Sequence, residues 1–409
     1  MAEHSEWPNA WTKETKHFVF RTNTSPELLE YYSTLLETYY GLMNKRVGIK
    51  PKGEYKKIKM TVNIYKSREE FHELSEAGIG PGTAGYFWSY DNTLNFYHDY
   101  QEPAVSDWVG LHECTHLLTF LIDQEYRTQI WLNEGLADYF GSATLDVQTT
   151  KKGYKIKIEP GKLQTDRVLT VQQAIEDEKD VKLEELFFLT KRDFHSFQYA
   201  HAWSFVYFLN NYDKGKYAKG FNKLFKSLYT LEKGVPYTRE DGYGKTGSAK
   251  VVTPEDVRDL LLKKIKVKDV NKLEMEWKTF IAEIPVDGPQ ARLKRGLRAV
   301  GQWEFEDALK DLDMAIEAGI VDPRAYWGRG RAKLWGGNPK GAVPDFQKAI
   351  ELDPLSGSFR YSLSQALYIS SKMSRDAEEG VAAARVQAGF AMELEPENER
   401  YREWFEEME

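Results

Sequence analysis

Two histidines and a glutamate within residues 111–117 have the spacing of a catalytic metal site. His112 and His116 are four positions apart, so on a helix their imidazoles leave the same face, one turn from each other. Both can then point at one ion, as two ligands of zinc must. Glu113 projects about 100° further round such a helix, where it can reach a water molecule without ligating the metal. The pattern predicts a zinc hydrolase, provided that the rest of the chain supplies a complete site.

A third metal ligand is expected downstream, because catalytic zinc usually has three protein ligands and one open position. Glu134 is the candidate: it follows His116 by eighteen positions, enough for the first helix to end and a second one to return. Asp138 lies one turn after Glu134 on the same helix face. A carboxylate there can accept a hydrogen bond from one ligand histidine and fix its tautomer.

The order His112-Glu113-x-x-His116, then Asn133-Glu134-x-x-x-Asp138, resembles the gluzincin zinc metallopeptidases, the clan of thermolysin and aminopeptidase N. Residues 131–140 (WLNEGLADYF) are similar to the second-helix signature of the peptidase MA-like bacterial proteins. The resemblance covers roughly residues 10–285 and is most specific over 108–141. It implies one Zn²⁺ held by His112, His116 and Glu134, with Glu113 as the general base and Asp138 as a support for one histidine.

The same resemblance implies a donor for the oxyanion, since gluzincins commonly supply a tyrosine or histidine from a later helix. Residues 197–203 (FQYAHAW) occupy the corresponding place. We favour Tyr199 as this catalytic donor and keep His201 as the alternative. Tyr199 as a packing residue at a helix start is the competing interpretation.

Gluzincins also hold an extended peptide against an edge strand beside the metal helix. Residues 84–90 and 93–98 form a predicted hairpin that turns at Asp91-Asn92 and leads into that helix. One of its strands is therefore the expected substrate edge, although its aromatic residues also suit a core. No Gly-x-Met-Glu-Asn stretch precedes the metal helix, which argues against recognition of a free N-terminus and favours endopeptidase-like action.

Composition excludes several other classes of protein. The chain has 409 residues, 41% of them hydrophobic, which is enough for two or three domains. The net charge of −7 is spread out without a long basic block, so no nucleic-acid partner is expected. Cys114 is the only cysteine, which excludes an intrachain disulfide and a Cys-rich zinc site, and we expect it in the core. No membrane span is expected, and the polar start is consistent with a cytoplasmic protein or with an exported one whose leader was trimmed.

The order of predicted elements defines three regions. Residues 1–104 read as an α/β unit, with strands at 17–22 and 57–65, helices at 26–43 and 67–74, and the hairpin. Residues 105–287 are mainly helical: a metal helix capped by Ser106, the second site helix, a β excursion at 149–158, and helices at 170–175, 182–189, 199–211, 216–229, 253 onward and 271–284. A Gly- and Lys-rich loop is predicted at 234–250.

Residues 288–409 contain a repeat with an offset of 34. Arg295-Gly296 matches Arg329-Gly330, and Asp311 matches Asp345. This period of paired helices resembles tetratricopeptide repeats, with a third copy about eight residues longer and a capping helix at 401–408. The repeats are expected to bind a partner protein or to cap the catalytic domain.

These observations predict an α+β protein: a thermolysin-like zinc peptidase domain, with a small mixed sheet and a helical active-site part, followed by an all-α repeat domain. The expected activity is hydrolysis of a peptide or protein substrate. One alternative is a catalytically silent scaffold whose repeats bind a partner, although a structural zinc needs no general base such as Glu113. Another is a zinc hydrolase acting on a non-peptide amide or ester.

Overall fold

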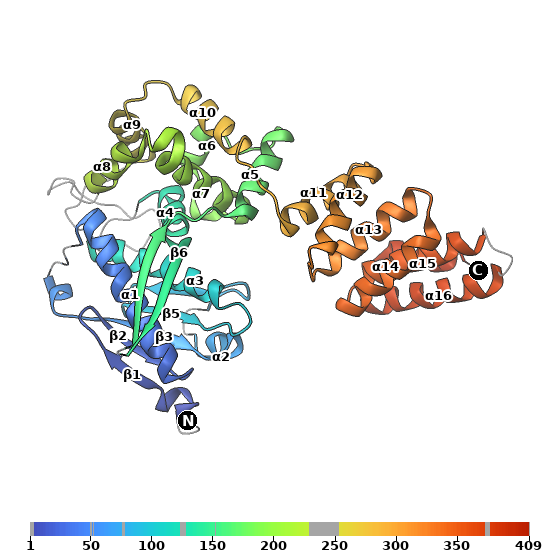
Figure 1. Ribbon diagram of the computed structural model, residues 1–409, viewed down its shortest axis with the longest axis horizontal. Coiled ribbons are helices and arrows are strands. Elements are labelled where there is room, and N and C mark those ends of the chain that lie inside the picture. The colour runs from blue at the N-terminus through green and yellow to red at the C-terminus, as the bar shows by residue number, and fades with distance from the viewer. Residues whose placement is uncertain are drawn as a thin grey trace. The chain divides into compact units, whose positions relative to one another are not determined.

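The chain folds into two compact units, residues Met1–Ile284 and Pro285–Glu409. The computed structural model describes residues 4–49, 51, 53–75, 78–122, 128–151, 153–228, 253–372 and 377–408. The first unit combines strands and helices, and the second is helical (Figure 1). No helix in these described ranges is long and apolar enough to cross a membrane. The predicted start of the repeat region at residue 288 lies three positions from this division.

A five-stranded mixed sheet forms the N-terminal part of the first unit. Its strands, in spatial order, are β1 (Trp11–Glu14), β2 (Phe18–Thr22), β3 (Met60–Tyr65), β5 (Thr93–Tyr97) and β4 (Gly85–Trp88). The three central strands run parallel, and β1 and β4 pair antiparallel at the two edges. The predicted hairpin is therefore present as β4 and β5, and β4 is an edge strand.

Two long helices contact this sheet and each other: α1 (Pro26–Val47) and α3 (Pro103–Ile122). The sequence defines the start of α1, because Ser25 Oγ accepts a hydrogen bond from the Leu28 N–H and Pro26 opens the helix. The short helix α2 (Arg68–Glu73) begins in the same way after Ser67. Alternate residues of β2 and β3 are buried, which is the pattern of a sheet with one fully covered face.

The predicted cap of the metal helix is wrong. Helix α3 begins at Pro103, one turn before the predicted start, so Ser106 lies inside the first turn. The Ser106 hydroxyl instead accepts a hydrogen bond of 2.7 Å from the Asp99 N–H. Proline is favoured at the first helical position, because its missing N–H has no partner there in any case.

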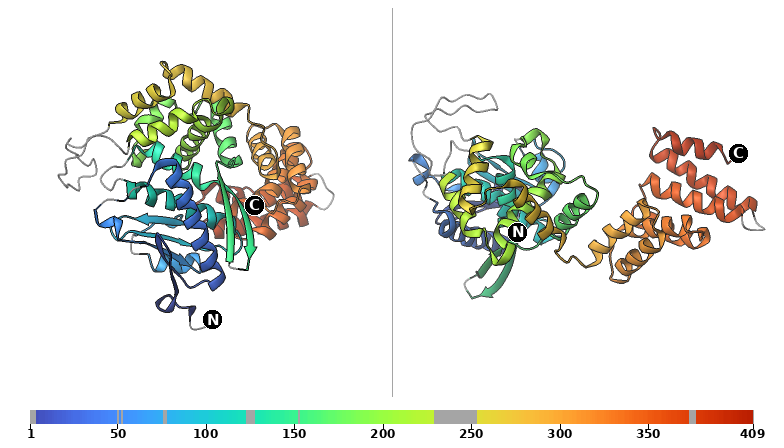
Figure 2. Two further views of the ribbon diagram at one scale, coloured as in Figure 1. Left: turned by 60° about the vertical axis from the view of Figure 1, so that its left-hand side comes forward. Right: turned by 90° about the horizontal axis from the view of Figure 1, so that it is seen from above.

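The rest of the first unit is mainly helical and contains one hairpin. Strands β6 (Ala143–Thr150) and β7 (Gly153–Pro160) pair along their full length, so the hairpin is longer than the predicted excursion at 149–158. It lies along α1, where the rings of Tyr31 and Tyr154 are 5.6 Å apart (Figures 1 and 2). The helices are α4 (Ile130–Gly141), α5 (Thr165–Glu176), α6 (Leu183–Phe188), α7 (Ser196–Asn211), α8 (Ala218–Leu228), α9 (Pro254–Ile265) and α10 (Val270–Ala282).

Helix α7 occupies the centre of this helical part. Its residues Trp203, Phe205 and Phe208 are fully buried, and it contacts α4, α5, α8 and α10. Helix α5 is longer than the predicted helix at 170–175, and it begins early enough to place Arg167 in its first turn. The predicted loop at 234–250 lies outside the described residues.

The second unit consists of helix pairs that follow one another in contact along the chain. Its helices are α11 (Pro289–Gly301), α12 (Phe305–Glu317), α13 (Pro323–Trp335), α14 (Pro339–Leu352), α15 (Gly357–Lys372), α16 (Ala377–Leu394) and α17 (Glu399–Glu406). Helices α13 and α15 each begin 34 residues after the first helix of the preceding pair, and α17 begins 42 residues after α15. The period and the longer third copy therefore agree with the sequence pattern.

The matched residues of the repeat make matched contacts. Arg295 binds both carboxylate oxygens of Asp311 at 3.2 Å. Arg329 binds Asp345 through the same two nitrogens at 3.1 and 2.6 Å. A bidentate pair of this kind requires both residues in a set orientation, which accounts for their joint recurrence at the same offset.

Candidate metal centre

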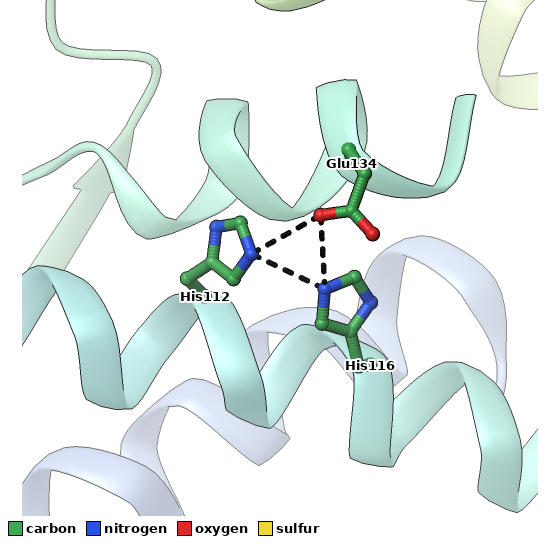
Figure 3. Close-up of side chains that lie close together, drawn as sticks. All are labelled: His112, His116 and Glu134. Atoms are coloured by element: carbon green, nitrogen blue, oxygen red, sulfur yellow. Dashed lines mark hydrogen bonds and ion pairs between the residues drawn. The ribbon is translucent and has the colours of Figure 1, made fainter. Parts of the chain in front are cut away.

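Helices α3 and α4 bring together His112, His116 and Glu134 (Figure 3). The Nε2 atoms of the two histidines are 3.2 Å apart, and each lies 3.4 Å from Glu134 Oε2. The three residues are buried or nearly so. One ligand atom from each lies within 4.8 Å of the others, so the group could hold a metal ion.

Asp138 lies behind the first histidine, on the same helix as Glu134. Its Oδ1 is 3.0 Å from His112 Nδ1, and its side chain is fully buried. With a proton on Nδ1 donated to this carboxylate, His112 keeps the lone pair of Nε2 directed toward the cluster. The geometry matches the support that the sequence predicted for Asp138.

The cluster favours a bound positive charge. Burial by itself disfavours charged imidazoles, but the carboxylates of Asp138 and Glu134 outweigh it and raise the pKa of His112. Glu134 has the same effect on the pKa of His116. Burial opposes ionisation of Glu134 as well, yet the two histidines hold its pKa well below the usual range. A proton or a metal cation therefore stabilises this arrangement of donors.

Glu113 contacts the sheet and also lies near the two histidines, whose pKa values it raises. Its Oε2 accepts a hydrogen bond of 3.0 Å from the backbone N–H of Phe87, in the edge strand β4. The carboxylate predicted as general base thus contacts the outer strand of the hairpin, one of whose strands was predicted to receive substrate. Cys114, the next residue, is fully buried and free, as expected of a core residue.

Tyr199, at the start of α7, reaches the cluster through its phenol. Burial and the neighbouring carboxylates of Glu134, Asp138 and Glu113 raise the pKa of Tyr199. The phenol therefore stays protonated and has a proton that it can donate at the site.

His201, the alternative to Tyr199, lies in the core of the helical part. Its Nδ1 is 2.8 Å from the Phe197 carbonyl, and its ring contacts those of Phe197 and Trp277. Burial lowers the pKa of His201. The structure thus places Tyr199, and not His201, near the carboxylates of the metal cluster.

Arg167 is a site residue that the sequence pattern did not reveal. Its Nη2 lies 2.7 Å from Asp138 Oδ2, its Nε donates a 2.8 Å hydrogen bond to Gln164, and its guanidinium lies 5.9 Å from the ring centre of Tyr199. A buried carboxylate such as Asp138 needs a cation beside it. No spacing in the sequence identifies Arg167 as that cation.

A search of curated proteins found no match. One family model, described as "Protein of unknown function (DUF1570)", matches residues 109–228. This segment begins in α3 and ends in α8, so it contains the complete metal cluster together with Glu113, Asp138, Arg167 and Tyr199. The part of the chain that is similar to this family is thus the part that carries the candidate metal centre.

Proposed function

We propose that this protein is a zinc-dependent peptidase of the gluzincin type, with His112, His116 and Glu134 as zinc ligands and Glu113 as the general base. One observation carries the proposal. Three ligand atoms from two helices converge on one point, and Glu113, adjacent to a ligand in sequence, lies beside them with a hydrogen bond from an edge strand. A site that only held a structural ion would need no carboxylate there.

The donor set suits zinc in number, chemistry and spacing. Tetrahedral zinc with bonds of about 2.0–2.1 Å separates its ligand atoms by about 3.3 Å. The three donor atoms here are 3.2, 3.4 and 3.4 Å apart. Two imidazole nitrogens and one carboxylate oxygen form one of the common ligand sets of catalytic zinc, and three ligands leave the fourth position free.

The chemistry divides between the ion and the side chains around it. When bound, zinc supplies a Lewis acid for a substrate carbonyl and for water. Glu113 accepts the proton of the attacking water and returns it to the leaving amine. The Tyr199 hydroxyl, held protonated by burial and by the carboxylates, donates a hydrogen bond to the negative charge that develops on the carbonyl oxygen.

The position of β4 supports a peptide as the substrate. An edge strand has unpaired backbone groups to which an extended chain can add. β4 is such an edge, and its Phe87 contacts Glu113. The helix pairs of the second unit, with their 34-residue period, support a tetratricopeptide-like module that binds a partner protein or caps the catalytic unit.

Two variants test the assignment, Glu113→Gln and His112→Ala, each purified and analysed for metal beside the wild type. The wild type and Glu113→Gln should each retain one zinc ion per chain, and His112→Ala should lose it. Hydrolysis of an internally quenched peptide library should be present in the wild type only. Retention of stoichiometric zinc by His112→Ala would show that the ligands are misassigned, and hydrolysis by Glu113→Gln would exclude its role as base.

Two further outcomes separate the alternatives. A zinc-loaded wild type that hydrolyses amides or esters but no peptide is a hydrolase of another class. A zinc-loaded wild type without any hydrolytic activity supports the silent scaffold.

A further inference from the structure

One stripe of helix α3 faces the edge strand β4. Val109, Glu113 and Phe120 are four and seven positions apart, so they lie along the same helix face. Each of them meets β4: Val109 lies against Gly85, Glu113 accepts the hydrogen bond from Phe87, and the rings of Phe87 and Phe120 are 5.3 Å apart. His112 and His116 belong to a neighbouring stripe that faces α4.

Glycine at position 85 permits this close approach of strand and helix. A Cβ atom at Gly85 would overlap the Val109 side chain and would lie 3.1 Å from the Asn95 carbonyl oxygen. Neither neighbour can move freely, because Val109 is buried in α3 and Asn95 belongs to β5. The absence of a side chain therefore lets β4 lie near enough for the Phe87 N–H to reach Glu113.

The direction of the backbone groups of β4 follows from this hydrogen bond. Because the Phe87 N–H donates to Glu113, it faces away from β5. In an antiparallel strand the N–H and C=O of one residue share a side, and successive residues alternate. Gly85 and Phe87 thus turn their backbone groups to the open edge, while Tyr86 and Trp88 turn theirs to β5.

We propose that the backbone N–H of Phe87 is the positioning group for the general base. The strand that would pair with substrate then also orients Glu113, so the carboxylate has a set place relative to a peptide lying along β4. The inference rests on the proposed function, and it adds a role for a main-chain group that a substitution of Phe87 reveals only if it removes the N–H. It also means that the Phe87 N–H is not free to bind the substrate backbone.

We expect loss of this hydrogen bond to lower kcat rather than to raise KM. Hydrogen bonds to a carboxylate are stronger than those between neutral groups, so this one holds Oε2 in place and leaves Oε1 for the proton. Without it, Glu113 would spend part of its time in other rotamers, whereas the substrate could still pair with the remaining outward groups of β4. Loss of the N–H should therefore lower kcat and leave KM nearly unchanged.

The contact can be tested without any enzymatic activity. In protein labelled with ¹⁵N-phenylalanine, the Phe87 amide signal is identified by its loss in Phe87→Leu. A hydrogen bond to a carboxylate moves an amide proton downfield, so this signal should shift upfield in Glu113→Ala. Asp107→Asn, a change elsewhere on α3, should leave it in place. An unchanged Phe87 signal in Glu113→Ala would overturn the proposal.

The functional test replaces only the N–H. Incorporation of the α-hydroxy acid analogue of phenylalanine at position 87 substitutes an ester oxygen for the N–H and keeps the side chain. For the zinc-loaded full chain we expect kcat to fall about tenfold or more, KM to stay within about twofold, and zinc content to be unchanged. A wild-type kcat, or a rise in KM alone, would overturn the proposal, and the second result would mean that the N–H binds substrate.

Phe87→Pro and Phe87→Ala form a matched pair for the same question. Both lose the ring that packs on Phe120, but only proline loses the N–H, and proline is tolerated where the N–H of an edge strand faces outward. The kcat of the proline variant should be about tenfold below that of the alanine variant, and equal values would contradict the proposal. If the wild type hydrolyses no peptide, the proposed function fails, and the amide signal still decides whether Phe87 holds Glu113.

Discussion

Arg167 forms an ion pair with Asp138, with 2.7 Å between Nη2 and Oδ2. The other oxygen of this carboxylate lies 3.0 Å from His112 Nδ1. Asp138 is fully buried, and Arg167 reaches it from α5, a helix that contributes no ligand candidate. The support of the first histidine is therefore a chain of three residues from three different helices.

Replacement of Arg167 should lower the free energy of unfolding even in the metal-free protein. Arg167→Met leaves the buried Asp138 carboxylate without its guanidinium, and loss of one partner from a buried pair costs about 3–5 kcal/mol. Arg167→Lys keeps a charge but cannot also hold Gln164 through Nε, so a smaller loss is expected. Urea denaturation of the metal-free protein measures both. Equal stability of Arg167→Met and the wild type would show that the pair does not neutralise Asp138.

Tyr199→Phe should separate catalysis from metal binding. Removal of a hydrogen-bond donor to an oxyanion costs about 10²–10³ in kcat, and zinc content should not change, because Tyr199 is not a ligand candidate. His201→Phe is the matched control, since His201 packs against Phe197 and Trp277 in the core. It should change the unfolding free energy and leave kcat within a few-fold. The reverse pattern would assign the oxyanion donor to His201.

Asp107 predicts a pH dependence of stability. Burial raises the pKa of Asp107 to about 6, although the hydrogen bond from Tyr31 lowers it. An unfolded aspartate has a pKa of about 3.9, so between about pH 4 and 6 the folded state binds more protons than the unfolded state. The contribution of Asp107 to stability is therefore greatest below pH 4 and falls as the pH rises to about 6.

Asp107→Asn should remove this dependence. The unfolding free energy of the variant minus that of the wild type should increase by about 1–3 kcal/mol from pH 4 to pH 7, since each unit of pKa shift corresponds to about 1.4 kcal/mol. Urea denaturation at the two pH values gives the difference directly, and the other titrating groups cancel in the comparison. A stability difference that is the same at both pH values would contradict the raised pKa.

Even the methyl side chain of alanine at position 330 should destabilise the second unit. A Cβ atom there would lie 2.7 Å from the ring of Phe346, which is fully buried between α13 and its neighbours. Gly330→Ala should therefore destabilise the second unit by about 1–3 kcal/mol. Gly301→Ala is the control, because no atom lies within 4 Å of its Cβ position. Calorimetry of the full chain should show a lowered transition for the first variant only.

Local spacing in the sequence was sufficient for several features. A difference of four positions places His112 and His116 on one helix face whatever surrounds them, because helix geometry is local. The helix predicted from residue 26 begins at Pro26, because Ser25 caps it locally, whereas Ser67, predicted inside its helix, is the cap before it. The offset of 34 predicted the helix pairs, since each repeat is built by the same local pattern of helix and turn.

The start of α3 and the length of the β6–β7 hairpin were not predicted, because other parts of the chain influence both. Serine is a favoured N-cap residue, but the Ser106 hydroxyl accepts a hydrogen bond from the Asp99 N–H, and the helix already begins at Pro103. Strand β7 packs on α1, and this contact extends a strand whose outer face is polar. Neither contact can be derived from the residues adjacent in sequence.

By itself, the sequence determined which residues could ligate a metal and which could act as base, since these depend on residue type and helical periodicity. Only the tertiary structure decided between Tyr199 and His201 as neighbours of the cluster, identified Arg167 as the cation beside Asp138, and placed the Phe87 N–H against Glu113. Each of these relations joins residues that are 26 or more positions apart in the chain. Such contacts depend on how helices and strands pack, and packing is a property of the whole fold rather than of any local pattern.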